Sequence, residues 1–187
     1  MATARPITEG SAVISTRGVE RLRAGHLWIY RSDVRSVHAE PGAIVRLVDE
    51  RGNFAGRAFY SDKSQISIRL LTREDVPIDR AFLTARIRRA AAYRDLVVQD
   101  SDACRLVYSE ADLLPSVIID RYGDYFVLQT LSQASDRLKG TLVDILVELF
   151  KPKGIVERND PKVRMLEGLE QRVSVLHGDV PSEIHAT

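Results

Sequence analysis

The sequence has a single cysteine, Cys104, among its 187 residues. One thiol cannot form a disulfide within the chain or a metal site of several thiolates, which is typical of proteins from a reducing compartment. The sequence also lacks any apolar run near the roughly 20 residues that a membrane-spanning helix needs. Residues 1–10 contain no apolar core of a signal peptide. We therefore predict a cytoplasmic protein with no membrane partner.

Glycine-rich cofactor motifs are absent as well. The 11 glycines never form the G-x-G-x-x-G turn that follows a strand in nucleotide-cofactor folds, and there is no Walker A motif. The four histidines show no metal-ligand spacing: His26, His38, His177 and His185. The sequence thus predicts no cofactor-binding residues and no metal ligands in this chain.

Charge is distributed unevenly along the chain, although the formal net charge is only +1. Residues 1–94 hold 17 Lys and Arg against 10 Asp and Glu, a net charge of +7, and residues 95–187 hold 10 against 16, a net charge of −6. Sixteen of the 17 cations in the first part are arginines, whose planar guanidinium pairs with phosphate and stacks on bases. An anionic partner explains this pattern, and so does a genomic preference for arginine.

The first 75 residues contain short strand-like runs separated by turn signals. Strands are predicted at 12–14, 28–30, 43–48, 54–60 and 66–71. Between the first two strands, a short helix is predicted that Thr16 caps and Gly25 ends. This spacing indicates a small β-barrel over residues 1–75.

The second part, residues 76–187, mixes helices and strands. A polar connector with Pro77 precedes a helix at 79–95, with Asp79 as its cap. Strands are predicted at 105–109, 117–120, 125–131, 154–157 and 172–176, and helices at 135–150 and 160–167. This mixture indicates a small α+β domain.

The helix at 79–95 has two distinct faces at a spacing of about 100° per residue. The face predicted to pack on the core consists of Leu83, Ile87, Ala90 and Ala91. The opposite face carries an aromatic–arginine stripe, Phe82, Arg86, Arg89 and Tyr93. Such a stripe could stack bases and hold phosphates, or it could dock the two aromatic rings on the neighbouring domain with the arginines around them.

The segment 25–31 brings a histidine, two aromatics and a cation together. Strand alternation would place His26, Trp28 and Tyr30 on one side and the intervening residues on the other. We predict that Trp28 is buried in the barrel. For His26, Tyr30 and Arg31, a role at the surface and a structural role remain open.

Two candidates for catalysis do not fit their chemistry. Cys104 has no neighbouring histidine or Pro-Cys context and begins an apolar strand, which favours a buried structural thiol. Glu110 and Asp112 are spaced as an acid–base pair could be, but the turn that follows favours hydrogen bonding to the loop backbone. No catalytic residue is predicted.

Three ordered motifs resemble one family. The segment Gly25-His26-Leu27-Trp28-Ile29-Tyr30 resembles the G-H-P-W-V-F type motif of the N-terminal PUA domain of SAM-dependent ribosomal RNA cytosine-C5 methyltransferases that act on the large-subunit RNA. Residues 105–122 resemble the family's R-L-V and E-G-D-G-L-P-G-L-I-V-D-R-Y stretches. Residues 157–160 and 167–169 resemble its E-R-x-D and E-G-L positions.

The sequence departs from the family pattern at four positions. Leu27 stands where proline is usual, and Ala111, Leu113 and Ser116 replace glycines. Family members also continue into a Rossmann-like domain that binds S-adenosylmethionine and carries the catalytic cysteine. The chain ends before such a domain, so the resemblance implies a part without catalytic activity of its own.

The resemblance implies a PUA-like β-barrel followed by a small α+β domain of the strand-strand-helix-strand-strand type. It implies binding of structured RNA, in particular large-subunit ribosomal RNA, with S-adenosylmethionine as the cofactor of the full-length enzyme. The predicted RNA-binding residues are Arg17, Arg23, His26, Tyr30, Arg31, Arg57, Lys63, Arg86 and Arg89.

Two other functions and a homodimer stay open at this point. The first is a protein-interaction module that docks a partner on its basic face. The second is a small hydrolase that uses Glu110, Asp112 or Asp120.

Overall fold

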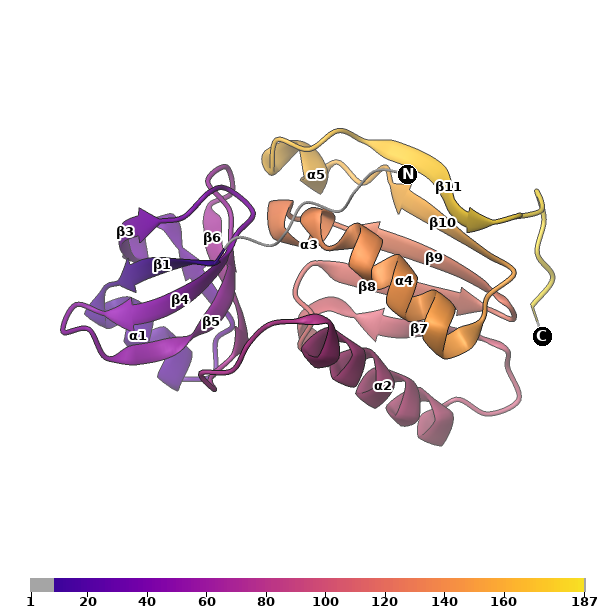
Figure 1. Ribbon diagram of the computed structural model, residues 1–187, viewed down its shortest axis with the longest axis horizontal. Helices are drawn as coiled ribbons and strands as arrows, with labels where there is room; N and C mark the ends of the chain where they lie inside the picture. The colour runs from indigo at the N-terminus through magenta and orange to yellow at the C-terminus, as the bar shows by residue number, and fades with distance from the viewer. Residues whose placement is uncertain (1–8, 187) are drawn as a thin grey trace.

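Two β-sheets, each with its own helices, make up the fold (Figure 1). The computed structural model describes residues 9–186; residues 1–8 and 187, which the predicted domain bounds include, lie outside the described residues. The first sheet is formed by residues before position 73 and the second by residues after position 102. The predicted α+β class is confirmed.

The first sheet has six strands in the order β2-β6-β5-β4-β1-β3 and curls around its own apolar core. The strands are β1 (Glu9–Ile14), β2 (Trp28–Tyr30), β3 (Val34–His38), β4 (Ile44–Asp49), β5 (Phe54–Tyr60) and β6 (Ile66–Thr72). Strands β1 and β4 run parallel, and the other neighbours are antiparallel. The core includes Ile14, Ile29, Leu47, Ile68 and Leu70.

Helix α1 (Thr16–Arg23) packs its buried Leu22 into this core. Its cap is Ser15, not Thr16 as predicted, because the Ser15 hydroxyl accepts a hydrogen bond from the Gly18 amide at 3.1 Å. Gly25 follows the helix at φ +94°, a left-handed conformation that glycine adopts without steric cost. The predicted helix stop is therefore confirmed.

The second sheet has five strands in the order β11-β10-β9-β8-β7. The strands are β7 (Ala103–Tyr108), β8 (Val117–Tyr122), β9 (Tyr125–Thr130), β10 (Gly154–Asn159) and β11 (Arg172–Gly178). Strands β9 and β10 are parallel, and α3 (Gln133–Arg137) and α4 (Lys139–Phe150) connect them. The predicted helix at 135–150 is thus two helices that meet at Leu138.

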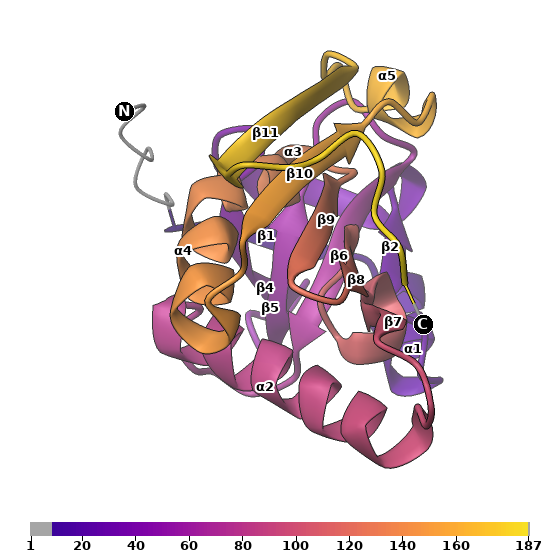
Figure 2. The ribbon, with the colours of Figure 1, turned by 90° about the vertical axis from the view of Figure 1, so that its right-hand side faces the viewer.

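Helix α2 (Arg80–Val97) begins at the predicted cap, where Asp79 Oδ1 accepts a hydrogen bond from the Phe82 amide at 2.9 Å. Its residues Leu83, Ile87 and Ala90 are buried in the core of the second sheet, as predicted. Figure 2 shows α2 and α4 on one side of this sheet. Two further helices are short: the 3-10 helix η2 (Ser109–Asp112), after β7, and α5 (Val163–Leu166), after β10.

Within the part of the chain that the structure describes, no helix covers the opposite face of the second sheet (Figure 2). The segment after β11 crosses one end of this face, where Pro181, Ser182 and Ile184 line a hollow with Tyr122. Exposed apolar side chains on this side of the sheet include Tyr108, Tyr122, Val173 and Val175. We call this surface the uncovered sheet face.

The two units share a packed junction. Ile44, Phe59 and Leu71, from strands of the first sheet, belong to the same apolar cluster as the core of the second sheet. A buried ion pair crosses the junction between Arg69 Nη2 and Glu167 Oε1, 2.8 Å apart. Apolar packing and a buried ion pair together hold the two units in a fixed relationship.

A second polar contact lies near that ion pair. The Gln133 side chain donates to Asp62 Oδ1 at 2.8 Å and to the Glu167 carbonyl oxygen at 3.1 Å. It also accepts a hydrogen bond from the Asp62 amide at 3.2 Å. The loop between β5 and β6 is thereby tied to the start of α3.

Candidate RNA-binding interface

Trp28 is 40% exposed, so the prediction that it is buried is wrong. Strand β2 has only three residues, and its one inward position is taken by the fully buried Ile29. Alternation turns Trp28 away from the barrel core and toward the second unit. There its indole Nε1 donates a hydrogen bond to Glu110 Oε1 at 2.8 Å.

The neighbouring carboxylate of η2 holds a different aromatic side chain indirectly. Asp112 accepts two hydrogen bonds from Arg94, at 2.8 and 2.6 Å, and one from the Tyr108 amide at 2.6 Å. The Arg94 guanidinium lies over the ring of Tyr93, 5.2 Å from its centroid. Glu110 of η2 therefore holds Trp28 directly, and Asp112 of η2 holds Tyr93 indirectly, through Arg94.

These contacts do not favour hydrolysis by the carboxylates. Glu110 also accepts a hydrogen bond from the Ser109 hydroxyl, and Asp120 is held by Arg105 at 2.8 Å. Each carboxylate that the sequence offered as an acid or base is occupied by a structural donor. A general acid or base needs a free position facing substrate.

The aromatic–arginine stripe of α2 is divided by its surroundings. Phe82 packs against the core, and the guanidinium of Arg86 lies over its ring, 4.9 Å from the centroid, while also donating to the Leu71 carbonyl oxygen at 3.4 Å. Burial, with a smaller effect of the nearby Arg89, lowers the pKa of Arg86 from its ordinary value. Phe82 and Arg86 therefore agree with the second interpretation of the stripe, in which an aromatic ring packs against the rest of the protein with an arginine around it.

The second half of the stripe is exposed. Tyr93 is 57% exposed, and Arg89 is an exposed cation without an ion pair among residues 9–186. Both side chains line a hollow of about 390 Å³ between α2 and η2, opposite Ala111 and Leu113. Ala111 follows Glu110, the residue that binds Trp28, although Trp28 itself does not line the hollow. We call Trp28, Tyr93, Arg89 and this hollow the junction face.

The loop at the end of η2 is left-handed at two residues other than glycine. Leu113 has φ +57° and Ser116 has φ +62°. Two of the three positions where the family pattern has glycine are thus the ones that need this conformation.

The other predicted residues are spread over the barrel. Arg17 is bound to the buried carboxylate of Asp33 at 2.5 Å, and Arg21 lies over the Tyr30 ring at 5.3 Å. Arg23 is exposed and lines a hollow of about 260 Å³ with Arg73. These side chains gather around α1.

Arg31, Arg57 and Lys63 have structural partners. Arg31 donates to the carbonyl oxygens of Asp62 and Ser64. Lys63 is exposed with its ammonium 3.7 Å from Asp62 Oδ2.

Arg57 lies between two carboxylates. Its guanidinium contacts Glu9 at 3.1 Å and Asp75 at 3.0 Å. This double pairing disfavours Arg57 as a phosphate contact. The predicted RNA-binding residues do not form one site. His26 is exposed next to the start of β2, whereas Arg89 belongs to the junction face. The structure therefore brings together only part of the predicted set.

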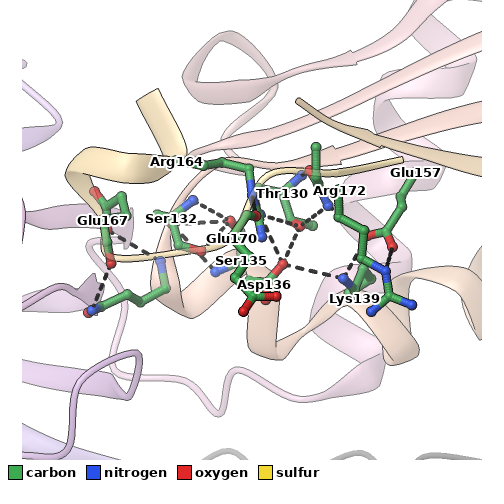
Figure 3. Close-up of polar contacts among 12 residues, drawn as sticks. Thr130, Ser132, Ser135, Asp136, Lys139, Glu157, Arg164, Glu167, Glu170 and Arg172 are labelled. Atoms are coloured by element: carbon green, nitrogen blue, oxygen red, sulfur yellow. Dashed lines mark hydrogen bonds and ion pairs between the residues drawn. The ribbon is translucent and has the colours of Figure 1, made fainter. Parts of the chain in front are cut away.

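A buried polar cluster fills the carboxyl edge of the parallel strands β9 and β10 (Figure 3). In open α/β sheets, this edge is where ligands commonly bind. Here the buried Arg164 donates to the Thr130 carbonyl oxygen, to Asp136 at 3.0 Å and to the Glu170 carbonyl oxygen at 2.8 Å. A protein side chain therefore occupies the place of a ligand.

Glu157, from the E-R-x-D segment, belongs to the same cluster. Its buried carboxylate contacts Lys139 at 2.7 Å, Ser174 at 2.6 Å, Asn159 at 2.9 Å and Arg172 at 3.1 Å. Burial alone would raise its pKa, but the hydrogen bonds from Lys139, Ser174 and Asn159 outweigh burial, and the pKa is lowered. The family-like motifs at 157–160 and 167–169 thus supply buried structural residues.

Cys104 is half-buried, and burial raises the pKa of its thiol. A raised pKa lowers the fraction of thiolate and hence reactivity, in line with the predicted structural role. Within residues 9–186, no group of three or more His, Cys, Asp and Glu could hold a metal ion. Over the same residues, none of the helices has the length and apolar character to span a membrane.

Comparison with known proteins decides the nature of the first unit. The family model for the PUA-like domain matches residues 12–73, from the second half of β1 to just beyond β6. Residues 12–73 are a PUA-like domain. The PUA-like domain therefore covers the curled sheet, α1 and the segment with Trp28.

The similarity to curated proteins extends beyond the PUA-like domain. Ribosomal RNA large subunit methyltransferase I of Vibrio cholerae is 38% identical over 175 residues, which cover 91% of this chain and 44% of that protein. The protein of the same name from Tolumonas auensis is 37% identical over 163 residues, which cover 84% of this chain and 41% of that protein. The chain spans less than half the length of these relatives.

A solved structure shares the fold of both units. It is SMU.776, a proposed methyltransferase complexed with SAH, with a TM-score of 0.75 and 17% identity. The match covers 92% of this chain and 44% of the other one. The PUA-like domain and the second unit thus form an arrangement that also occurs in another protein.

Proposed function

We propose that this chain is the RNA-recognition part of a ribosomal RNA methyltransferase. The observation that carries the proposal is the similarity over 91% of the chain to ribosomal RNA large subunit methyltransferase I, together with a PUA-like domain at residues 12–73. The junction face supports it, because exposed aromatic rings beside a free arginine are suited to bind RNA.

In this proposal, residues 1–75 form the RNA-binding domain and residues 76–187 a middle domain. The partner is structured RNA of the large ribosomal subunit, and the site of action is the cytoplasm. Methyl transfer from S-adenosylmethionine would require a further domain, because the ligand-binding edge of β9 and β10 in this chain is filled by Arg164.

Salt dependence of RNA binding tests the proposal. Each phosphate that a cation neutralises contributes a log–log slope of roughly −0.7 to −0.9. Arg23 and Arg89 are exposed and form no ion pair with other residues of the 9–186 range, so they are the best pair to remove. The Arg23→Ala, Arg89→Ala variant should bind a structured ribosomal RNA fragment with a slope shallower by about one to two units.

A matched variant controls for the loss of two positive charges. Lys153 and Lys162 lie on the second unit away from the junction face, and Lys153 pairs with Asp124 at 2.8 Å. Their replacement by alanine should leave the slope unchanged. Absence of salt-dependent binding by the unmodified protein would contradict the proposed function itself.

Protein docking remains a second candidate function because of the uncovered sheet face. The charges on this face are matched in pairs, Arg105 with Asp120 at 2.8 Å and Arg158 with Asp160 at 3.1 Å. A neutral surface with exposed tyrosine and valine side chains offers little to a polyanion and more to an apolar protein surface. Binding of a partner protein through an apolar surface, in place of RNA, would favour this alternative.

A further inference from the structure

Two exposed aromatic rings at the junction face are held in place by carboxylates of one short helix. Trp28 is fixed by its hydrogen bond to Glu110, and Tyr93 by Arg94, which is itself held by Asp112. Ordering a ring before a ligand arrives reduces the entropy that binding must overcome. An exposed ring that serves only as surface does not need such support.

The hollow beside Tyr93 has the properties of a site for a flat, partly charged ligand. It has a volume of about 390 Å³, apolar atoms from Ala111 and Leu113 on one wall, and the exposed guanidinium of Arg89 on the other. The carboxylate of Asp112 is neutralised by Arg94 at 2.6 Å, so it does not repel an anion at full strength.

We propose that the junction face binds unpaired nucleotides of RNA, with bases stacked on Trp28 and Tyr93 and a backbone phosphate on Arg89. This inference rests on the proposed function and specifies the partner. A nucleotide within an A-form helix has its base faces covered by its neighbours, so only loops, bulges and ends can use such rings. The site therefore prefers unpaired over double-stranded RNA.

The uncovered sheet face is the rival location for stacking, because it carries exposed tyrosines. Among residues 9–186 it presents no unpaired cation: Arg105 lies over Tyr108 at 5.1 Å and is bound to Asp120, and Arg158 is bound to Asp160. The junction face combines rings with a free guanidinium, which is the combination that single-stranded RNA sites use. Tyr122, 38% exposed on the sheet face, supplies a matched control for loss of a surface aromatic.

The fluorescence of Trp28 gives a direct readout, because it is the one tryptophan of the chain. Stacking of a base on the indole should quench its emission. We expect an oligouridine of about ten nucleotides, within the usual site sizes, to quench Trp28 with saturation. A blunt RNA duplex of equal length should quench much less.

Variants test the assignment by the anisotropy of a labelled oligouridine. Trp28→Ala and Tyr93→Ala should each weaken binding by roughly five- to a hundredfold, the range for loss of one stacked base. Trp28→Phe and Tyr93→Phe should retain most of the affinity, and Tyr122→Ala should bind like the unmodified protein. Each variant is compared at equal folded fraction by circular dichroism.

The outcomes separate this inference from the proposed function. Salt-dependent binding of structured RNA without quenching of Trp28, and without loss in the alanine variants, would overturn the junction site and leave the proposed function intact. Equal affinity for the oligouridine and the duplex would also overturn it. Failure to bind any RNA would remove both.

Discussion

The indole of Trp28 and the carboxylate of Glu110 are 82 residues apart in the sequence and 2.8 Å apart in the structure. This hydrogen bond joins the PUA-like domain to η2 of the second unit at the solvent-exposed margin of their junction. Because this contact lies at the margin, Trp28 contributes more to the surface of the protein than to its apolar core.

Replacement of Trp28 by alanine should therefore cost little stability. We expect a loss below about 2 kcal/mol, since one hydrogen bond to a charged group and a half-exposed ring are removed. Phe126→Ala is the buried comparison, because that ring is 2% exposed and packs on Phe150 at 5.3 Å. It should cost about 3 to 5 kcal/mol. Urea denaturation of both variants checks the difference, and equal losses would contradict it.

Replacement of Arg69 should lower the free energy of unfolding far more than its place on a strand suggests. Its partner Glu167 is 1% exposed, and a buried carboxylate without its cation costs about 3 to 5 kcal/mol. Arg69→Met should show this loss, and the double variant Arg69→Met, Glu167→Gln should recover part of it. A double-mutant cycle on unfolding free energies measures the coupling. Additive losses would show that the ion pair does not act as a unit.

The pKa of Glu157, lowered in the folded protein, makes its contribution to stability depend on pH. A group with a lowered folded pKa stabilises the protein above its unfolded pKa of about 4.3, and this contribution is lost as pH falls through the folded value. Glu157→Gln should cost about 1 to 3 kcal/mol near neutral pH. The gap between the unfolding free energies of the two proteins should narrow as pH falls below about 4.3, and a constant gap would contradict this assignment.

Ser116 has a left-handed backbone that glycine adopts more readily. Ser116→Gly and Ser116→Ala both remove the hydroxyl, so their difference reports the backbone. The glycine variant should be more stable than the alanine variant by about 1 kcal/mol. Thermal unfolding measures the order, and a more stable alanine variant would show that the loop relaxes.

The chain should not bind S-adenosylmethionine, because Arg164 and its partners fill the carboxyl edge of β9 and β10. We expect isothermal titration calorimetry to give no heat of binding. Stoichiometric binding at micromolar affinity would require a site elsewhere in the chain.

Local signals in the sequence predicted much of the fold. Asp79 and the spacing of Leu83, Ile87 and Ala90 identified the start and the buried face of α2. Strand β3 was not predicted, because its sequence Val-Arg-Ser-Val-His has only two apolar residues. Antiparallel pairing with β1 at the edge of the sheet forms the strand in spite of this weak pattern.

The contacts between the two units could not be predicted from the sequence. The pairing of Arg69 with Glu167, 98 residues later, exists only once the two units have docked. The hydrogen bond from Trp28 to Glu110 also needs the docked units. The error at Trp28 has a local cause, because β2 has one inward position and Ile29 occupies it. The spacing of Glu110 and Asp112 is visible in the sequence. Their role in holding two aromatic rings follows only from the structure.

The docked junction of the two units has a geometric consequence. The shared cluster with Ile44, Phe59 and Leu71 and the buried Arg69–Glu167 pair oppose movement of one sheet relative to the other. A nucleotide on the junction face is then held at a constant offset from strand β11, at the far edge of the second sheet. Under the proposed function, the two units would therefore offer RNA one rigid surface, on which an anchored nucleotide keeps the same position relative to both sheets.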